Sequence, residues 1–177
     1  HDFPSDAEGV VLPYGVYDVQ RNHGSVFVGT SHDTAQFAVD NIRCWWLELG
    51  REYYQNVRPQ LLILADCGGS NGARLRLWKA LLERVLCDRC GLSVTVSHYP
   101  PGASKYNPIE HRLLCQISKN SAGCPLRNYE TILNHIRTTK TRTGLRVRAK
   151  LITKRYETGI KVSEKEFKQL RFNPSDV

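Results

Sequence analysis

Asp66 and Glu110 are the two carboxylates whose sequence surroundings suit chemistry. Asp66 directly follows the apolar run Leu61–Ala65 and precedes the glycine-rich segment 67–72. A carboxylate in this place lies at the carboxyl end of a strand, the edge where open α/β sheets place their sites. Glu110 borders the apolar stripe of a helix that we expect to begin near Asn107, so its carboxylate faces the fold. We expect the two carboxylates to meet at the same sheet edge.

Two converging carboxylates could hold a pair of Mg²⁺ ions about 4 Å apart, an arrangement that activates the attacking oxygen and stabilises the leaving oxygen of a phosphodiester. Each residue also has a simpler interpretation. Asp66 could be a turn or helix-capping aspartate. Glu110 could form an ordinary salt bridge with Arg112 or Lys105. Residue type and spacing leave these alternatives open.

The apolar periodicity predicts a mixed α/β fold. We expect Trp45 and Trp46 to belong to the core, although they could instead stack on bases. In the first part of the chain we expect a β-hairpin (Tyr14–Val19 and Ser25–Thr30), a helix from Asp33 with Gln36 as its capping-box partner, and a strand buried on both faces (Leu61–Ala65). A helix carrying Leu75, Trp78, Leu81, Leu82 and Val85 and a strand over Leu92–Ser97 should follow. The last expected elements are helices from Asn107 and over Tyr129–Ile136, a strand (Val147–Leu151) and a terminal helix (Ser163–Leu170) with Glu166 at its capping-box position.

Composition narrows the function classes. The 177 residues are 41% hydrophobic and carry a net charge of +8, with a pI of about 9.3. No run approaches the roughly 20 apolar residues that span a bilayer, and no signal-peptide pattern begins the chain, so we expect a cytoplasmic protein. The positive charge favours nucleic acid as the partner, with a generically basic domain as the alternative.

The cysteine and methionine content gives information on the state of the thiols and on the extent of the chain. The six cysteines lack the density of a disulfide scaffold, so reduced thiols are expected. Cys87 and Cys90 form a lone Cys-x-x-Cys pair, for which zinc or redox use is the minor interpretation. The chain has no methionine and begins at His1, so we expect it to be part of a longer protein.

The segment 137–155 is strongly basic, with eight lysines and arginines and no acidic residue. Arg146, Arg148 and Lys150 alternate with apolar residues, which predicts a strand with one basic face. Such a strand could follow a phosphate backbone, or it could be a solvated edge strand protected by charge. We expect an extended lead-in over 1–13, a core over 14–140 and a basic C-terminal extension over 141–177.

Two long motifs resemble the ISAzo-type group of bacterial insertion-sequence transposases. They are Leu64–Gly72, which reads LADCGGSNG, and His98–Leu113, which reads HYPPGASKYNPIEHRL. The resemblance covers nearly the whole chain, because four further segments match: Tyr14–Asp18, Gly29–Val39, Thr141–Leu145 and Gly159–Ser163.

The resemblance implies an RNase H-like mixed sheet flanked by helices, with an Asp-Asp-Glu (DDE) triad that binds Mg²⁺ or Mn²⁺. Asp66 matches the second aspartate and Glu110 the glutamate. The first aspartate and its strand would lie upstream of the region matching residues 1–4, so we expect the first strand to be missing. Asp18 and Asp33 are nearby carboxylates for which a substitute role is a minor alternative.

The resemblance also implies cleavage and strand transfer on DNA, with transposon ends and target DNA as partners, a homo-oligomer as the working form, and association with the nucleoid. Pro108 and the pair Ser121–Ala122 depart from the usual pattern, which is compatible with a decaying element. We expect DNA contacts from Asn71, Lys105, His111, Arg112, Arg146, Arg148 and Lys150.

Two other functions stay open. The chain could be a catalytically dead DNA-binding remnant, and the missing first strand favours this for the fragment alone. Salt-sensitive DNA binding without magnesium-dependent cleavage would identify such a remnant. A repair or recombination nuclease of the same fold would cleave DNA without joining its ends.

Overall fold

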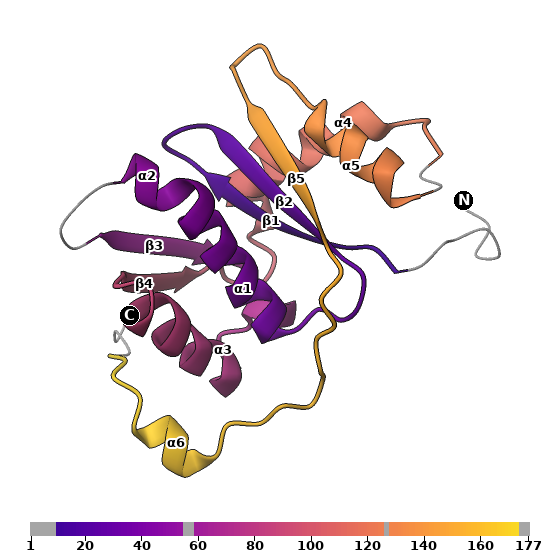
Figure 1. The fold of residues 1–177 in the computed structure, drawn as a ribbon. Helices are drawn as coiled ribbons and strands as arrows, with labels where there is room; N and C mark the ends of the chain where they lie inside the picture. Colours follow the sequence, from indigo (N-terminus) through magenta and orange to yellow (C-terminus); the bar gives the residue numbers. More distant parts are fainter. Residues whose placement is uncertain (1–9, 55–58, 126–127, 174–177) are drawn as a thin grey trace. The chain divides into compact units, whose positions relative to one another are not determined.

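The computed structural model describes residues 10–54, 59–125 and 128–173. It divides the chain into two compact units, the first drawn from the ranges 1–32 and 102–155 and the second from 33–101 and 156–177. Each unit contains its own sheet and helices (Figure 1).

The first unit contains a three-stranded mixed sheet in the order β1-β2-β5. Strands β1 (Leu12–Asp18) and β2 (His23–Gly29) form an antiparallel hairpin, and β5 (Arg146–Ile152) pairs with β2 in parallel. The hairpin turn is stabilised by Asp18, whose Oδ1 accepts hydrogen bonds from the backbone N–H groups of residues 20 and 21, both at 3.1 Å. The expected hairpin and basic strand are confirmed, with ends shifted by one or two residues.

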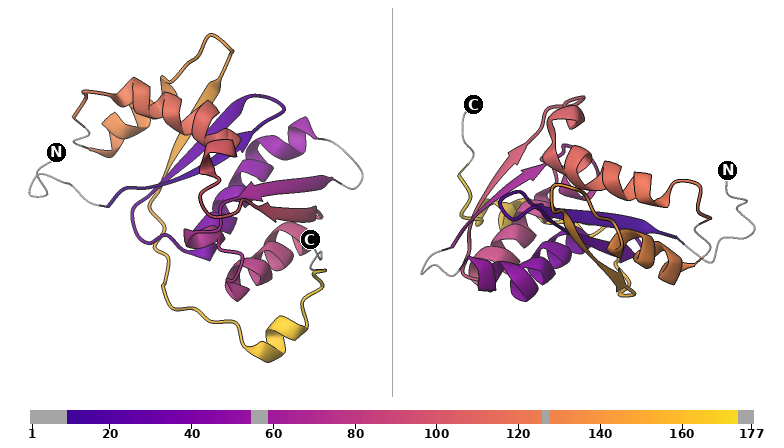
Figure 2. Two further views of the ribbon diagram at one scale, coloured as in Figure 1. Left: turned by 180° about the vertical axis from the view of Figure 1, so that it is seen from behind. Right: turned by 90° about the horizontal axis from the view of Figure 1, so that it is seen from above.

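The helical segments of this unit precede β5 in the chain. They are η5 (Ser104–Tyr106), the π-helical turn η6 (Glu110–Leu114), α4 (Cys115–Ser121) and α5 (Tyr129–Arg137), and Figure 2 shows α4 and α5 beside the three strands. Buried residues of η6 and α5 pack against the sheet. The approach is close, because a β-carbon added at Gly24 would lie 2.3 Å from Leu113 Cδ1. The core between the sheet and these helices contains Val26, Val28, Leu113, Ile132, Leu133, Ile136 and Leu145.

The second unit contains the parallel pair β3 (Gln60–Ala65) and β4 (Ser93–His98). The connection between them runs through η3 (Gly69–Asn71), α3 (Arg76–Leu81) and the π-helical segment η4 (Leu82–Asp88). Helix α1 (Ala35–Trp45), which continues through η2 (Trp46–Gly50) and α2 (Arg51–Tyr53), packs on α3 and η4. Trp45, Trp46 and Trp78 are buried, so the expected core role of Trp45 and Trp46 is confirmed.

Two details of the second unit differ from expectation. The strand at 61–65 is not buried on both faces, since Leu62 and Leu64 are 60% and 42% exposed. Burial alternates along β3, and the face that carries these two leucines is the more exposed one. The cap of α1 is Thr34 rather than Asp33, because the Thr34 hydroxyl accepts a hydrogen bond from the Phe37 N–H at 3.1 Å.

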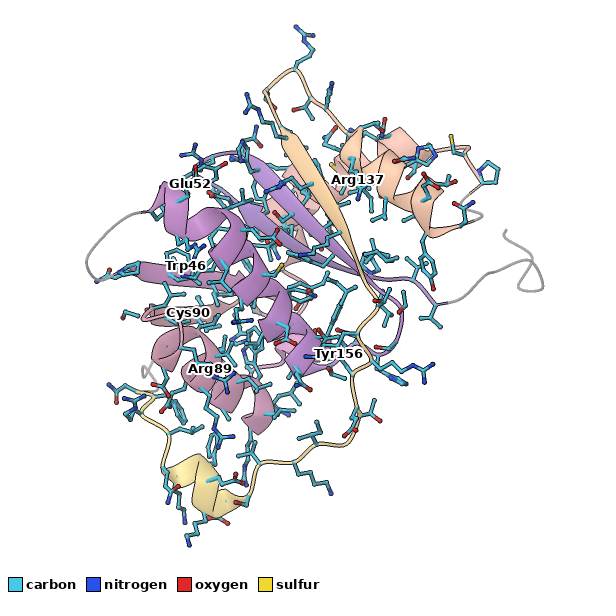
Figure 3. All side chains as sticks on the ribbon, viewed as in Figure 1. Trp46, Glu52, Arg89, Cys90, Arg137 and Tyr156 are labelled. Atoms are coloured by element: carbon cyan, nitrogen blue, oxygen red, sulfur yellow. The ribbon has the colours of Figure 1, made fainter. Side chains whose placement is uncertain are left out.

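The C-terminal segment belongs to the second unit. The buried ring of Tyr156 meets Phe37 edge to face at 5.3 Å, and its hydroxyl donates to the Asp40 carboxylate at 3.1 Å (Figure 3). Helix α6 (Glu164–Lys168) begins with the expected capping box between Ser163 and Glu166. These contacts attach the segment to α1 by packing as well as by hydrogen bonds.

The expected division into 1–13, 14–140 and 141–177 stays a prediction. Residues 1–9 of the lead-in lie outside the described residues, and residues 12 and 13 begin β1. The range 141–177 contains β5, which lies in the first unit, and α6, which lies in the second.

Leu113→Ala tests the core of the first unit. The side chain is fully buried against the sheet, so its truncation should lower the free energy of unfolding by about 3 kcal/mol. Leu62→Ala removes the same atoms from an exposed position and should change stability by less than about 0.5 kcal/mol. Urea unfolding of both variants measures the difference, and equal losses would contradict the assigned core.

Candidate active site and nucleic-acid interface

Asp66 lies immediately after β3, and its side chain is exposed. Because β3 and β4 are parallel, their carboxyl ends share one edge of the sheet, which is where Asp66 was expected. In the described part of the chain, no hydrogen bond or ion pair engages the Asp66 carboxylate. The helix-capping interpretation is wrong, because Gly68 is the residue that precedes η3 and it makes no side-chain cap.

The segment 66–72, which we call the Asp66 loop, is tied to the end of β4. The Tyr99 N–H donates to the Ala65 carbonyl at 2.8 Å, and the Cys67 thiol donates to the Tyr99 carbonyl at 2.9 Å. His98 Nε2 donates to the Asn71 carbonyl at 2.8 Å. Sequence reasoning missed Cys67 and His98 because it treated His98 only as the start of a loop. The signal was available, since a residue that ends the second of two parallel strands reaches the same edge.

Glu110 is the first residue of η6 and is half-buried. Its N–H donates to the carbonyl of the buried Asn107 at 3.1 Å. Neither Lys105 nor Arg112 forms an ion pair with Glu110 in the ranges that the structure describes. The salt-bridge interpretation of Glu110 is therefore wrong. Glu110 therefore begins a π-helical turn, and its carboxylate has no partner among the described residues.

Asp66 belongs to the second unit and Glu110 to the first, so their convergence stays a prediction. Asp18 is engaged in the hairpin turn, and Asp33 is exposed with Oδ2 3.1 Å from the position of a β-carbon at Gly69. Within the described residues, no group of three or more His, Cys, Asp or Glu side chains could hold a metal ion. The oxygen donors of Asp66 and Glu110 are of the type that Mg²⁺ prefers.

The expected basic strand is β5, at one end of the order of the described sheet. Arg146, Arg148 and Lys150 are exposed along it and alternate with partly buried apolar residues. Arg137 on α5 (Figure 3) donates to the Ala149 carbonyl from Nε at 3.2 Å and from Nη2 at 3.0 Å. The Arg137 guanidinium therefore links β5 to α5.

The register places His23 directly beside Arg146. Burial lowers the pKa of His23, and the positive charges of Arg146 and Arg21 lower it further. Asp18 acts in the opposite direction, but the cations outweigh it. Burial is the main cause of the shift, and the smaller contributions of Arg146 and Arg21 reflect the cations gathered at this end of the sheet.

The remaining expected DNA contacts lie on loops and on η6. Asn71 is half-buried and its carbonyl accepts the His98 bond, while Lys105 and Arg112 are exposed. His111 is exposed, and its Nε2 donates to the Lys105 carbonyl. His111 therefore holds the loop that presents Lys105, in addition to any phosphate contact.

The described elements define a mixed α/β protein with an acidic strand end and a basic strand. A family model described as the Rhodopirellula transposase DDE domain matches residues 1–177, and the chain belongs to that family. The resemblance to ISAzo-type DDE transposases is confirmed. No curated protein matches the chain, and no solved structure matches it. Among the described helices, none is long and apolar enough to cross a membrane.

His23→Gln tests the electrostatics of the basic strand. A pKa below the ordinary value of 6.5 means that the unfolded chain takes up a proton that the folded chain does not, so stability falls as the pH drops below about 6.5. We expect the variant to lose less stability than the parent between neutral and acidic pH. Urea unfolding at both pH values gives the comparison, and an unchanged loss would contradict the lowered pKa.

Proposed function

We propose that the chain is the catalytic core of an insertion-sequence transposase with an RNase H-like fold, which cleaves DNA at transposon ends and transfers the strand to target DNA. Membership of the DDE transposase family supports the reaction class. The observation that carries the site is Asp66: an exposed carboxylate at the carboxyl end of a parallel strand, with no side-chain partner among the described residues. The mixed α/β elements are compatible with the fold.

In this proposal Asp66 and Glu110 supply carboxylate oxygens as ligands for Mg²⁺ or Mn²⁺. When bound, the metal ions lower the cost of forming the attacking oxyanion and stabilise the leaving oxygen. Water attacks the phosphodiester at the transposon end first, and the resulting 3′-hydroxyl then attacks the target strand. The contributions of this chain are to hold the carboxylates in place and to orient the phosphates around them.

The DNA path in this proposal follows β5. Arg146, Arg148 and Lys150 would contact successive phosphates, and their exposure along β5 supports a positive surface there. Contacts from the loop and η6 would come from Lys105, His111, Arg112 and Asn71. The protein would act as a homo-oligomer on the bacterial nucleoid in the cytoplasm.

Asp66→Asn and Glu110→Gln test the catalytic assignment in the protein that contains this chain. Each substitution keeps the shape of the side chain but removes the charge that a divalent cation requires. We expect Mg²⁺-dependent cleavage and strand transfer to disappear while binding to transposon-end DNA persists. Glu130→Gln, at an exposed position on α5, is the matched control and should retain activity.

Retained strand transfer in Asp66→Asn or Glu110→Gln would sink the catalytic assignment. An unmodified protein that binds DNA in a salt-sensitive way but never cleaves it would identify the catalytically dead remnant. Cleavage without joining would instead indicate a nuclease.

Arg148→Ala tests the DNA path. If this side chain contacts a phosphate, its loss should weaken binding of all sequences and reduce the slope of log K against log salt by about one. Lys161→Ala removes an exposed charge outside β5 and should leave the slope unchanged. Fluorescence anisotropy at several salt concentrations measures DNA binding by both variants. Equal slopes for the two variants would exclude β5 as the DNA path.

A further inference from the structure

The Asp66 loop has unusual conformational freedom for a segment that follows a strand. Gly68, Gly69 and Gly72 make up three of its seven residues. Gly69 has a φ of +56°, which disfavours any residue with a side chain, and the Asp33 carboxylate lies against the space that a β-carbon would occupy. The loop contains an internal backbone bond, from the Gly72 N–H to the Gly69 carbonyl at 3.3 Å, and η3 packs against α1, so its remaining order comes from hydrogen bonds to its surroundings.

Those bonds come from two consecutive residues at the end of β4. Tyr99 holds the start of the loop through backbone groups, because it bonds to the Ala65 carbonyl and receives the Cys67 thiol. His98 holds the far end through its side chain, with Nε2 2.8 Å from the Asn71 carbonyl. The register pairs His98 with Ala65, so the imidazole starts level with the residue that precedes Asp66.

The geometry points to His98 as a positioning residue for Asp66. Its Nε2–H fixes the end of the Asp66 loop, so that the exposed carboxylate is presented to a divalent cation in one orientation. This inference rests on the proposed metal-binding role of Asp66. A carbonyl oxygen only accepts hydrogen bonds, so the His98 ring must carry its proton on Nε2.

The first measurement uses the unaltered chain. Imidazole ¹⁵N chemical shifts distinguish the two neutral tautomers, and we expect His98 to carry its proton on Nε2. A ring with its proton on Nδ1 would overturn the inference, because Nε2 could then not donate to Asn71.

The second measurement compares His98→Gln with His98→Asn in the full chain. The glutamine amide nitrogen can occupy the place of Nε2, whereas the shorter asparagine places its nitrogen near Nδ1 and cannot reach the carbonyl. The probe is Mn²⁺ alone, followed by the paramagnetic broadening of backbone amide signals of residues 66–72. We expect His98→Asn to weaken Mn²⁺ binding several-fold and to increase the mobility of the loop, and His98→Gln to restore both.

Ser97→Ala is the matched control on the same strand, because Ser97 is exposed and points to the other face of the sheet. Wild-type broadening and loop order in His98→Asn would overturn the positioning role. Asp66→Asn separates this failure from that of the proposed function. If it abolishes the Mn²⁺ effect while His98→Asn does not, only the inference fails; if Asp66→Asn leaves the effect intact, the metal role fails and the inference with it.

Discussion

The parallel pairing of β3 with β4 is the constraint on which the candidate site depends. Parallel strands end at the same edge, so this pairing brings Ala65 level with His98 although the two residues are far apart in the chain. The bonds made by His98 and Tyr99 then tie the glycine-rich loop that follows Asp66 to the end of β4. Without the pairing, these bonds between the Asp66 loop and the end of β4 could not form.

In the first unit, a second parallel pairing also joins two strands that are far apart in the chain. Strand β5 joins β2 across more than a hundred residues, and it carries a row of exposed cations along the sheet. On the opposite face, Val26 and Val28 pack with Leu113 and the apolar residues of α5. Within β5 the alternation of side chains therefore separates two tasks: Val147, Ala149 and Leu151 pack against the core, and the cations between them are exposed.

Local exposure also distinguishes Asp18 from the two candidate site carboxylates. Asp18 is buried, and its oxygen accepts two backbone bonds in a turn, so its charge serves the fold. Asp66 is exposed and Glu110 is half-buried, and neither carboxylate has a described partner. A carboxylate that makes no hydrogen bond or ion pair within the fold can bind a cation without first breaking such a bond.

Local patterns in the sequence determined most of the elements: the hairpin, the strand that precedes Asp66, the capping box at Ser163 and the alternation of Arg146 to Lys150, because each depends on neighbours within a few residues. The motifs around Asp66 and Glu110 also indicated the family, since each is an unbroken run of residues that can be read from the sequence alone. Only the tertiary structure showed that Leu62 and Leu64 are exposed, that β5 pairs with β2, and that His98 holds the Asp66 loop. These features depend on which distant strands pair and which faces are covered, and such long-range contacts leave no periodic signal in the chain.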